Sequence, residues 1–163
     1  MKTLYVIRHA KSSWEPSFLH DFDRKLNARG KADALVMASR LKEKGIFPDF
    51  VVCSPAKRAL KTAKRFMKVF DVPSSFITQE KQLYLPKLEN IYDIIFSFTE
   101  DKQQIFLFTH NPGITEFVND VANAKIINIP TSGIVAITFN NLKWNQITSG
   151  SGQVLFFDYP KAE

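Results

Sequence analysis

Short runs of β-branched and aromatic residues alternate along this chain with longer stretches in which apolar residues recur at helical spacing. Strands are predicted at about Thr3–Arg8, DFVVC, Phe76–Thr78, QIFLFT, GIVAITF and QVLFFDY, with Trp144 in a further short strand between the last two. Such alternation is typical of an α/β protein, here a three-layer α/β/α arrangement with a mainly parallel central sheet. With neither a repeat nor a linker in the pattern, we expect a single domain over residues 1–163.

Four helices are predicted between these strands. The first is LNARGKADALVMASRLKEKG, with Asn27 as N-cap, Gly45 as stop, and an apolar face of Leu35, Ala38 and Leu41. The second, AKRALKTAKRFMKVF, follows Pro55, which we expect in its first turn. Its inward face is predicted to hold Leu60, Ala63, Phe66 and Met67. The remaining two are LENIYDIIFSF and PGITEFVNDVAN, the latter beginning at Pro112.

Composition and charge narrow the class of protein. A chain of 163 residues that is 45% hydrophobic fits one domain with a sizeable core, and its net charge of +6 favours anionic partners. The single cysteine, Cys53, excludes an internal disulfide framework and a cysteine-rich zinc site. Since neither a signal-peptide core nor a run of about 18 apolar residues is present, we expect a cytoplasmic protein without a membrane partner.

Basic side chains gather where the predicted strands end. Arg8 and His9 end the first strand, Arg58 lies in the first turns of the helix after the second, and His110 ends the fourth. The carboxyl ends of parallel strands meet at one edge of a sheet, and helix N-termini there add oriented backbone N–H groups. The predicted crevice therefore suits an anion.

These residue types match the needs of phosphoryl transfer. Guanidinium groups bind the phosphoryl oxygens, and a neutral imidazole is a competent nucleophile. His9 would attack phosphorus, Arg8, Arg58 and a protonated His110 would offset the developing charge, and water would hydrolyse the phosphohistidine. The cations supply the charge that a metal would otherwise bring, so we expect no metal and no cofactor.

Three segments in this order, LYVIRHAK, CSPAKRALKTA and FTHNPGI, resemble the signature segments of the histidine phosphatase superfamily, whose fold is phosphoglycerate mutase-like. RHAKSSW, DFDRKLNARG and IPTSGIVAITF are similar to the SixA-type branch of phosphohistidine phosphatases, so the likeness covers nearly the whole chain. The resemblance implies that His9 is the phosphorylated nucleophile and that His110 is the second active-site histidine. It also implies that Arg8 and Arg58 bind the phosphate and that Arg24 reaches the phosphate or the adjoining substrate.

One departure from the superfamily concerns the general acid. Mutase and broad-specificity members carry a glutamate after the third strand that protonates an alkoxide leaving group, whereas this chain reads TQEKQLYLP. Glu80 precedes Leu83 instead of following it, so we do not assign it this role; Glu80 and Asp21 are the residues to test for a hidden acid. Without an acid, the predicted substrate is phosphohistidine in a protein, such as a histidine phosphotransfer domain.

Other functions remain open from the residues alone. The same site would suit a phosphatase of small-molecule phosphate esters or a non-catalytic module that recognises phosphate. A nucleic-acid-binding domain would use the basic residues Lys57, Lys61, Lys64, Arg65 and Lys68, but they recur around the outer face of one helix without a nucleic-acid motif, so we expect no such partner.

Two further residues have simpler interpretations. CSPAKR resembles the Cys-x5-Arg loop of cysteine phosphatases but is one residue short, and Cys53 is expected to be a buried structural thiol. His20 is expected to be a loop residue.

Overall fold

Residues 1–162, which the computed structural model describes, fold around one six-stranded sheet. The strands are β1 (Lys2–Arg8), β2 (Phe50–Cys53), β3 (Ile77–Gln79), β4 (Gln104–Thr109), β5 (Ile134–Phe139) and β6 (Gln153–Asp158), in the order β3-β2-β4-β1-β5-β6. The first four in this order are mutually parallel, β5 is antiparallel to β1, and β6 is antiparallel to β5. The sheet is thus mixed and mainly parallel.

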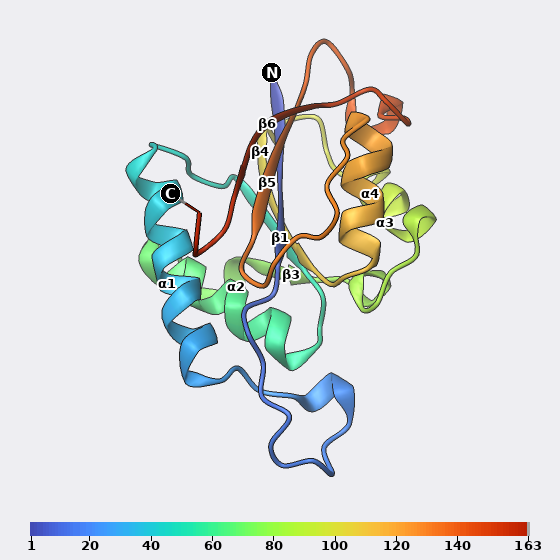
Figure 1. Cartoon of the computed structure of the whole chain (residues 1–163). Coiled ribbons are helices and arrows are strands. Elements are labelled where there is room, and N and C mark those ends of the chain that lie inside the picture. The colour runs from blue at the N-terminus through green and yellow to red at the C-terminus, as the bar shows by residue number, and fades with distance from the viewer. Residues whose placement is uncertain (163) are drawn as a thin grey trace.

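Helices cover both faces of this sheet. They are α1 (Ala28–Glu43), α2 (Lys57–Val69), α3 (Leu88–Phe96) and α4 (Gly113–Ala122). Figure 1 shows the sheet nearly edge-on, with α1 and α2 on one side and α3 and α4 on the other. Each side has its own apolar core, which includes Met37 and Phe66 under α1 and α2, and Ile95 and Phe117 under α3 and α4. The predicted three-layer α/β/α class is confirmed.

Helix α1 begins where the sequence predicts and packs tightly against the loop after β1. The side chain of Asn27 accepts a hydrogen bond of 2.8 Å from the Gly30 N–H, as an N-cap residue does. A Cβ atom at Gly30 would lie only 2.1 Å from the Lys11 carbonyl oxygen, so glycine is needed for this approach. Of the predicted apolar face, Ala38 and Leu41 are buried, but Leu35 is only partly buried. Ala34 and Met37 complete the buried face in its place.

The two predicted proline positions need small corrections. Pro55 lies two residues before the first residue of α2, and Pro112 is the N-cap of α4 and not its first helical residue. On α2, Ala63, Phe66 and Met67 are buried as predicted, whereas Leu60 is partly buried at the edge of the core.

Trp144 does not lie in a strand, contrary to the prediction. It opens a short 3₁₀ helix, Trp144–Gln146, and its side chain is fully buried between Phe98 and Phe139. The indole N–H donates a 2.9 Å hydrogen bond to the Lys102 carbonyl oxygen. A buried indole needs an acceptor for its N–H, and this loop geometry provides one.

The strand register places the ends of three strands at the same level. Arg8 on β1 pairs with Thr109 on β4, and Cys53 on β2 pairs with Phe108 on β4. The residues that follow these strands therefore meet at one edge of the sheet. Within residues 1–162 no helix has both the length and the apolar character needed to span a bilayer.

Candidate active site

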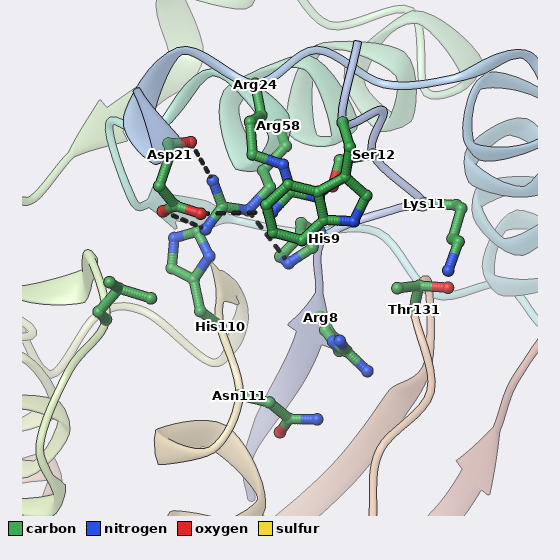
Figure 2. A pocket seen from close by; sticks show the side chains of 12 residues that line it. Arg8, His9, Lys11, Ser12, Asp21, Arg24, Arg58, His110, Asn111 and Thr131 are labelled. Carbon is green, nitrogen blue, oxygen red and sulfur yellow. Dashed lines mark hydrogen bonds and ion pairs between the residues drawn. The ribbon is translucent and has the colours of Figure 1, made fainter. Parts of the chain in front are cut away.

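A pocket of about 310 Å³ opens at this edge of the sheet. The five residues predicted from the sequence all line it: Arg8, His9, Arg24, Arg58 and His110. His9 and His110 directly follow β1 and β4, and Arg58 is the second residue of α2. Figure 2 shows the side chains converging from these separate elements. The sheet register thus brings together residues more than 100 positions apart.

His9 is held in one orientation by contacts on both ring nitrogens. Its Nδ1 lies 2.8 Å from the Ala10 carbonyl oxygen, which can only accept a hydrogen bond, so we assign the ring proton to Nδ1. Nε2 then carries a lone pair, and the Arg58 Nε–H donates to it at 3.3 Å. The Ala10 N–H in turn donates at 2.9 Å to Thr62 on α2, which fixes the loop that carries the histidine.

The surroundings keep His9 neutral. The residue is only 7% exposed. Burial lowers the pKa of its imidazole from 6.5 to about 3, and the charges of Arg58, Arg8 and Arg24 add to this effect while the hydrogen bond to Ala10 opposes it. A neutral imidazole with a free electron pair on Nε2 is the form that attacks phosphorus.

Asp21 anchors Arg58 from the far side of the pocket. The Arg58 guanidinium donates to the Asp21 carboxylate (Nη2 to Oδ2, 2.9 Å) and to the Asp21 carbonyl oxygen (2.6 Å), and the Tyr84 hydroxyl donates to the same carboxylate at 2.7 Å. Partial burial by itself would raise the pKa of Asp21, but the hydrogen bonds from Tyr84 and Arg58 and the Arg58 charge outweigh it and lower the value to about 2. Asp21 is therefore an ionised carboxylate at neutral pH.

His110 is neutral as well, so the prediction that its imidazole is protonated is wrong. Its Nε2 lies 2.7 Å from the Ser54 hydroxyl oxygen, and its ring centre lies 5.2 Å from that of His9. Burial, with smaller contributions from the neighbouring His9 and Arg58, lowers the pKa of His110 to about 2. The sequence does not reveal this, because the shift depends on burial that only the folded chain supplies.

Two buried nitrogen atoms at the pocket lack hydrogen-bond partners within residues 1–162. They are Nε of Arg8 and Nδ1 of His110. Arg8 is oriented by a 2.9 Å hydrogen bond from its Nη1 to the Ile129 carbonyl oxygen. Buried polar groups are almost always paired in folded proteins, so unpaired nitrogens on two residues that line one pocket indicate a place for a ligand with acceptor oxygens.

Arg24 reaches the pocket, and its neighbours are residues that the sequence did not single out. Its Nε–H donates at 3.2 Å to the Ser13 carbonyl oxygen, and its guanidinium also contacts the Ser12 hydroxyl and the Asp21 carboxylate. The guanidinium carbon lies 3.4 Å from the centre of the Trp14 ring, so the indole stacks on it. This packing orders the loop between β1 and α1.

Three residues weighed from the sequence lie outside the pocket. Glu80 lines a separate hollow beside Phe98 and Lys102. Cys53 is fully buried at the end of β2, and burial raises the pKa of its thiol, as expected for a structural cysteine. His20 is exposed in the loop before Asp21. Within the described residues, no three His, Cys, Asp or Glu side chains are grouped so that they could hold a metal ion.

Several lining residues went unassigned from the sequence: Lys11, Ser12, Trp14, Leu85, Asn111 and Thr131. Asp21 was named only as a residue to test, and its contact with Tyr84, 63 positions away, has no signal in a single sequence. Ser54 was equally hidden. The DFDR segment did offer one clue, because an aspartate three residues before an arginine is placed to pair with it, and Asp21 and Arg24 lie 3.3 Å apart.

Comparisons with known proteins agree with this site. The model of the histidine phosphatase superfamily (branch 1) matches residues 4–83. An uncharacterized chloroplastic protein of Arabidopsis thaliana is 29% identical over an alignment covering 93% of this chain and 72% of that protein. The SixA structure from Agrobacterium tumefaciens has a TM-score of 0.80 at 25% identity and covers 98% of each chain. The structure of the protein histidine phosphatase SixA with tungstate has a TM-score of 0.82 at 20% identity and covers 97% of each chain.

The chain belongs to the histidine phosphatase superfamily, and within it the fold is similar to that of SixA proteins. Family and fold together identify it as a phosphatase.

Proposed function

We propose that this phosphatase removes the phosphoryl group from phosphohistidine in a partner protein, through a phosphohistidine intermediate on Nε2 of His9. The observation that carries the proposal is the state of His9, which is buried and neutral, with its proton directed to the Ala10 carbonyl oxygen and its Nε2 facing Arg58 at 3.3 Å. Release of the Arg58 hydrogen bond would free the electron pair on Nε2 to attack phosphorus.

The reaction takes two steps. In the first, a bond forms between Nε2 of His9 and phosphorus while the bond between phosphorus and the substrate nitrogen breaks, and the substrate imidazole leaves. In the second, water attacks phosphorus, the bond to Nε2 breaks, and inorganic phosphate leaves as H2PO4−, which keeps both protons of the water, while His9 returns to its neutral form. The Nδ1–H to Ala10 hydrogen bond steadies the imidazolium character that phosphorylation gives to His9.

The hydrogen-bond donors around His9, two of them on arginine cations, would stabilise the transferring group. Nε of Arg8 and Nδ1 of His110 are buried without partners and are available to phosphoryl oxygens. The Nε–H of Arg58, released from His9, would donate to an oxygen of a phosphoryl group on Nε2, while Asp21 keeps the guanidinium in place. The protein histidine phosphatase SixA, whose fold is similar, has been solved in complex with tungstate, also an oxyanion, which supports an oxyanion as the ligand of this fold.

The protonation of Asp21 favours a nitrogen leaving group over an alkoxide. It is the one carboxylate among the described residues that line the pocket, and its lowered pKa, about 2, leaves it without a proton to give at pH 7. A serine or sugar oxygen would have to leave as a high-energy alkoxide. The imidazole of phosphohistidine can carry a proton on its other nitrogen and leave neutral.

The rim of the pocket suits a protein substrate. Trp14 and Leu85 line it and are 71% and 52% exposed, so apolar side chains border the entrance. Exposed apolar groups beside a polar pocket are typical of surfaces that contact other proteins.

The test is a side-by-side comparison of kcat/KM at pH 7, in EDTA, for a phosphorylated histidine phosphotransfer domain and for a sugar phosphate. We expect clear preference for the phosphoprotein, loss of turnover in His9→Ala, and normal turnover in His20→Ala, which removes an exposed histidine outside the pocket. Rapid quenching should trap a phosphoryl adduct that is stable in base and labile in acid. Equal or better turnover of the sugar phosphate would refute the substrate class, and phosphate binding without turnover would indicate a recognition module.

A further inference from the structure

Another hollow, of about 410 Å³, lies outside the pocket, between the start of α1 and one face of α2. It is lined by one apolar residue, Leu26, and by five basic side chains, Lys25, Lys31, Lys57, Lys61 and Arg65, which together we call the basic groove. The three from α2 are spaced four residues apart. They form one row about 12 Å long on the helix, at a rise of 1.5 Å per residue.

The charge of the basic groove is not balanced within the protein. None of its five cations makes an ion pair with any residue in 1–162, although seven such pairs occur elsewhere in that range. Like charges held along one helix face repel one another. Lys64 and Lys68 are also basic and exposed on α2, but they do not line the groove. The basic residues of the groove are therefore a distinct cluster and not simply the solvent-exposed face of the helix.

The basic groove begins beside the active-site pocket. Lys25 directly follows Arg24, and Lys57 directly precedes Arg58, and both arginines line the pocket. A protein whose phosphoryl group reaches His9 would have part of its surface near the chain segments that carry these lysines.

We propose that the basic groove is a docking surface for acidic side chains of the protein that carries the phosphohistidine. This rests on the function proposed above and adds the charge of the partner to it. No aromatic side chain lines the groove, so it lacks the platform on which nucleic-acid bases stack. Carboxylates spread over about 12 Å of the partner's surface would match the length of the row of cations on α2.

The test uses two phosphohistidine peptides of identical sequence, except that one carries glutamates and the other glutamines at the third to sixth positions on one side of the phosphohistidine. An extended chain covers about 3.3 Å per residue, so these positions reach the row on α2. We expect the wild-type protein to show about tenfold higher kcat/KM for the acidic peptide at low salt, the lower end of the range for electrostatic steering, and to lose the preference in 0.5 M salt.

Two double variants of α2 carry the same charge change. Lys61→Glu with Arg65→Glu alters the basic groove, and Lys64→Glu with Lys68→Glu alters cations of the same helix outside it. The first should abolish the preference for the acidic peptide, and the second should retain most of it. Turnover of free phosphohistidine, which is too small to reach the groove, reports on the pocket alone.

The outcomes separate the two proposals. Equal preference in both double variants, or in wild type at low and high salt, would overturn the docking surface while leaving the phosphatase proposal intact. Failure of the wild type to turn over either peptide or free phosphohistidine would overturn the proposed function, and the docking surface with it. Tight, salt-sensitive binding of a DNA oligonucleotide that the first double variant alone abolishes would assign the groove to nucleic acid instead.

Discussion

The neutral state of two buried histidines predicts that acid will destabilise the protein well above the pH at which its carboxylates titrate. His9 and His110 have their pKa values lowered from 6.5 to about 3 and about 2, chiefly by burial. Unfolding returns both imidazoles to water and to the ordinary value. Above about pH 6.5 both imidazoles are neutral in the folded and in the unfolded chain, so they do not change the free energy of unfolding. Below this pH the unfolded chain binds two protons that the folded chain does not, so the free energy of unfolding falls as the pH falls.

The size of the effect follows from the two pKa values. At pH 5 each histidine favours the unfolded state by about 2 kcal/mol, so the pair lowers the free energy of unfolding by about 4 kcal/mol relative to pH 7. This is a large part of the usual 5–15 kcal/mol. The lowered pKa of Asp21 acts in a different window, because its contribution is lost only as the pH falls from about 4 towards 2.

Urea unfolding of the wild type at pH 7, 6 and 5 measures this directly. His110→Gln should remove about half of the pH dependence, and His20→Gln, an exposed position, serves as the matched control. A fall of less than about 1 kcal/mol in the wild type between pH 7 and 5 would show that the two histidines accept protons in the folded protein in this range, and the lowered pKa values would have to be abandoned.

Two substitutions test the supports of the site. Asp21→Asn weakens a charged hydrogen bond to Arg58, worth about 1.5 kcal/mol or more, so kcat should fall by about tenfold or more for nitrogen-linked and ester substrates alike; selective loss of ester turnover would instead reveal Asp21 as a general acid. Gly30→Ala places a methyl group 2.1 Å from the Lys11 carbonyl oxygen, and we expect a loss of about 1–3 kcal/mol in urea unfolding together with lower activity, whereas unchanged stability would mean that the loop after β1 moves freely.

Much of the fold could be predicted because the spacing of apolar residues along the chain differs between strands and helices. Buried strands and amphipathic helices leave a direct trace in the order of apolar residues, and Asn27 and Gly45 mark the ends of α1 as their chemistry requires. Trp144 was misplaced because an isolated aromatic residue fits a strand and a buried loop equally well. Its environment is decided by Phe98, Phe139 and the Lys102 carbonyl, all distant in the sequence.

The sequence predicted which basic residues form the site, but it did not predict that His110 is neutral. Arg8, His9 and His110 are fixed by local position, since each lies at the end of a strand. The neutral state of His110 and the anchoring of Arg58 by Asp21 depend on burial and on contacts across the fold. No arrangement of residues along one strand or helix encodes either.

The binding of phosphate and the absence of a general acid for the leaving group have one physical cause. The same guanidinium groups that favour a phosphoryl anion also favour a carboxylate over a carboxylic acid, so a carboxyl group that pairs directly with them has no proton to give to a leaving group. Asp21 is the instance in this chain, since hydrogen bonds from Tyr84 and Arg58 hold it ionised. A substrate whose leaving nitrogen already has a proton avoids this conflict, which makes the protonation of Asp21 and the choice of substrate a single question.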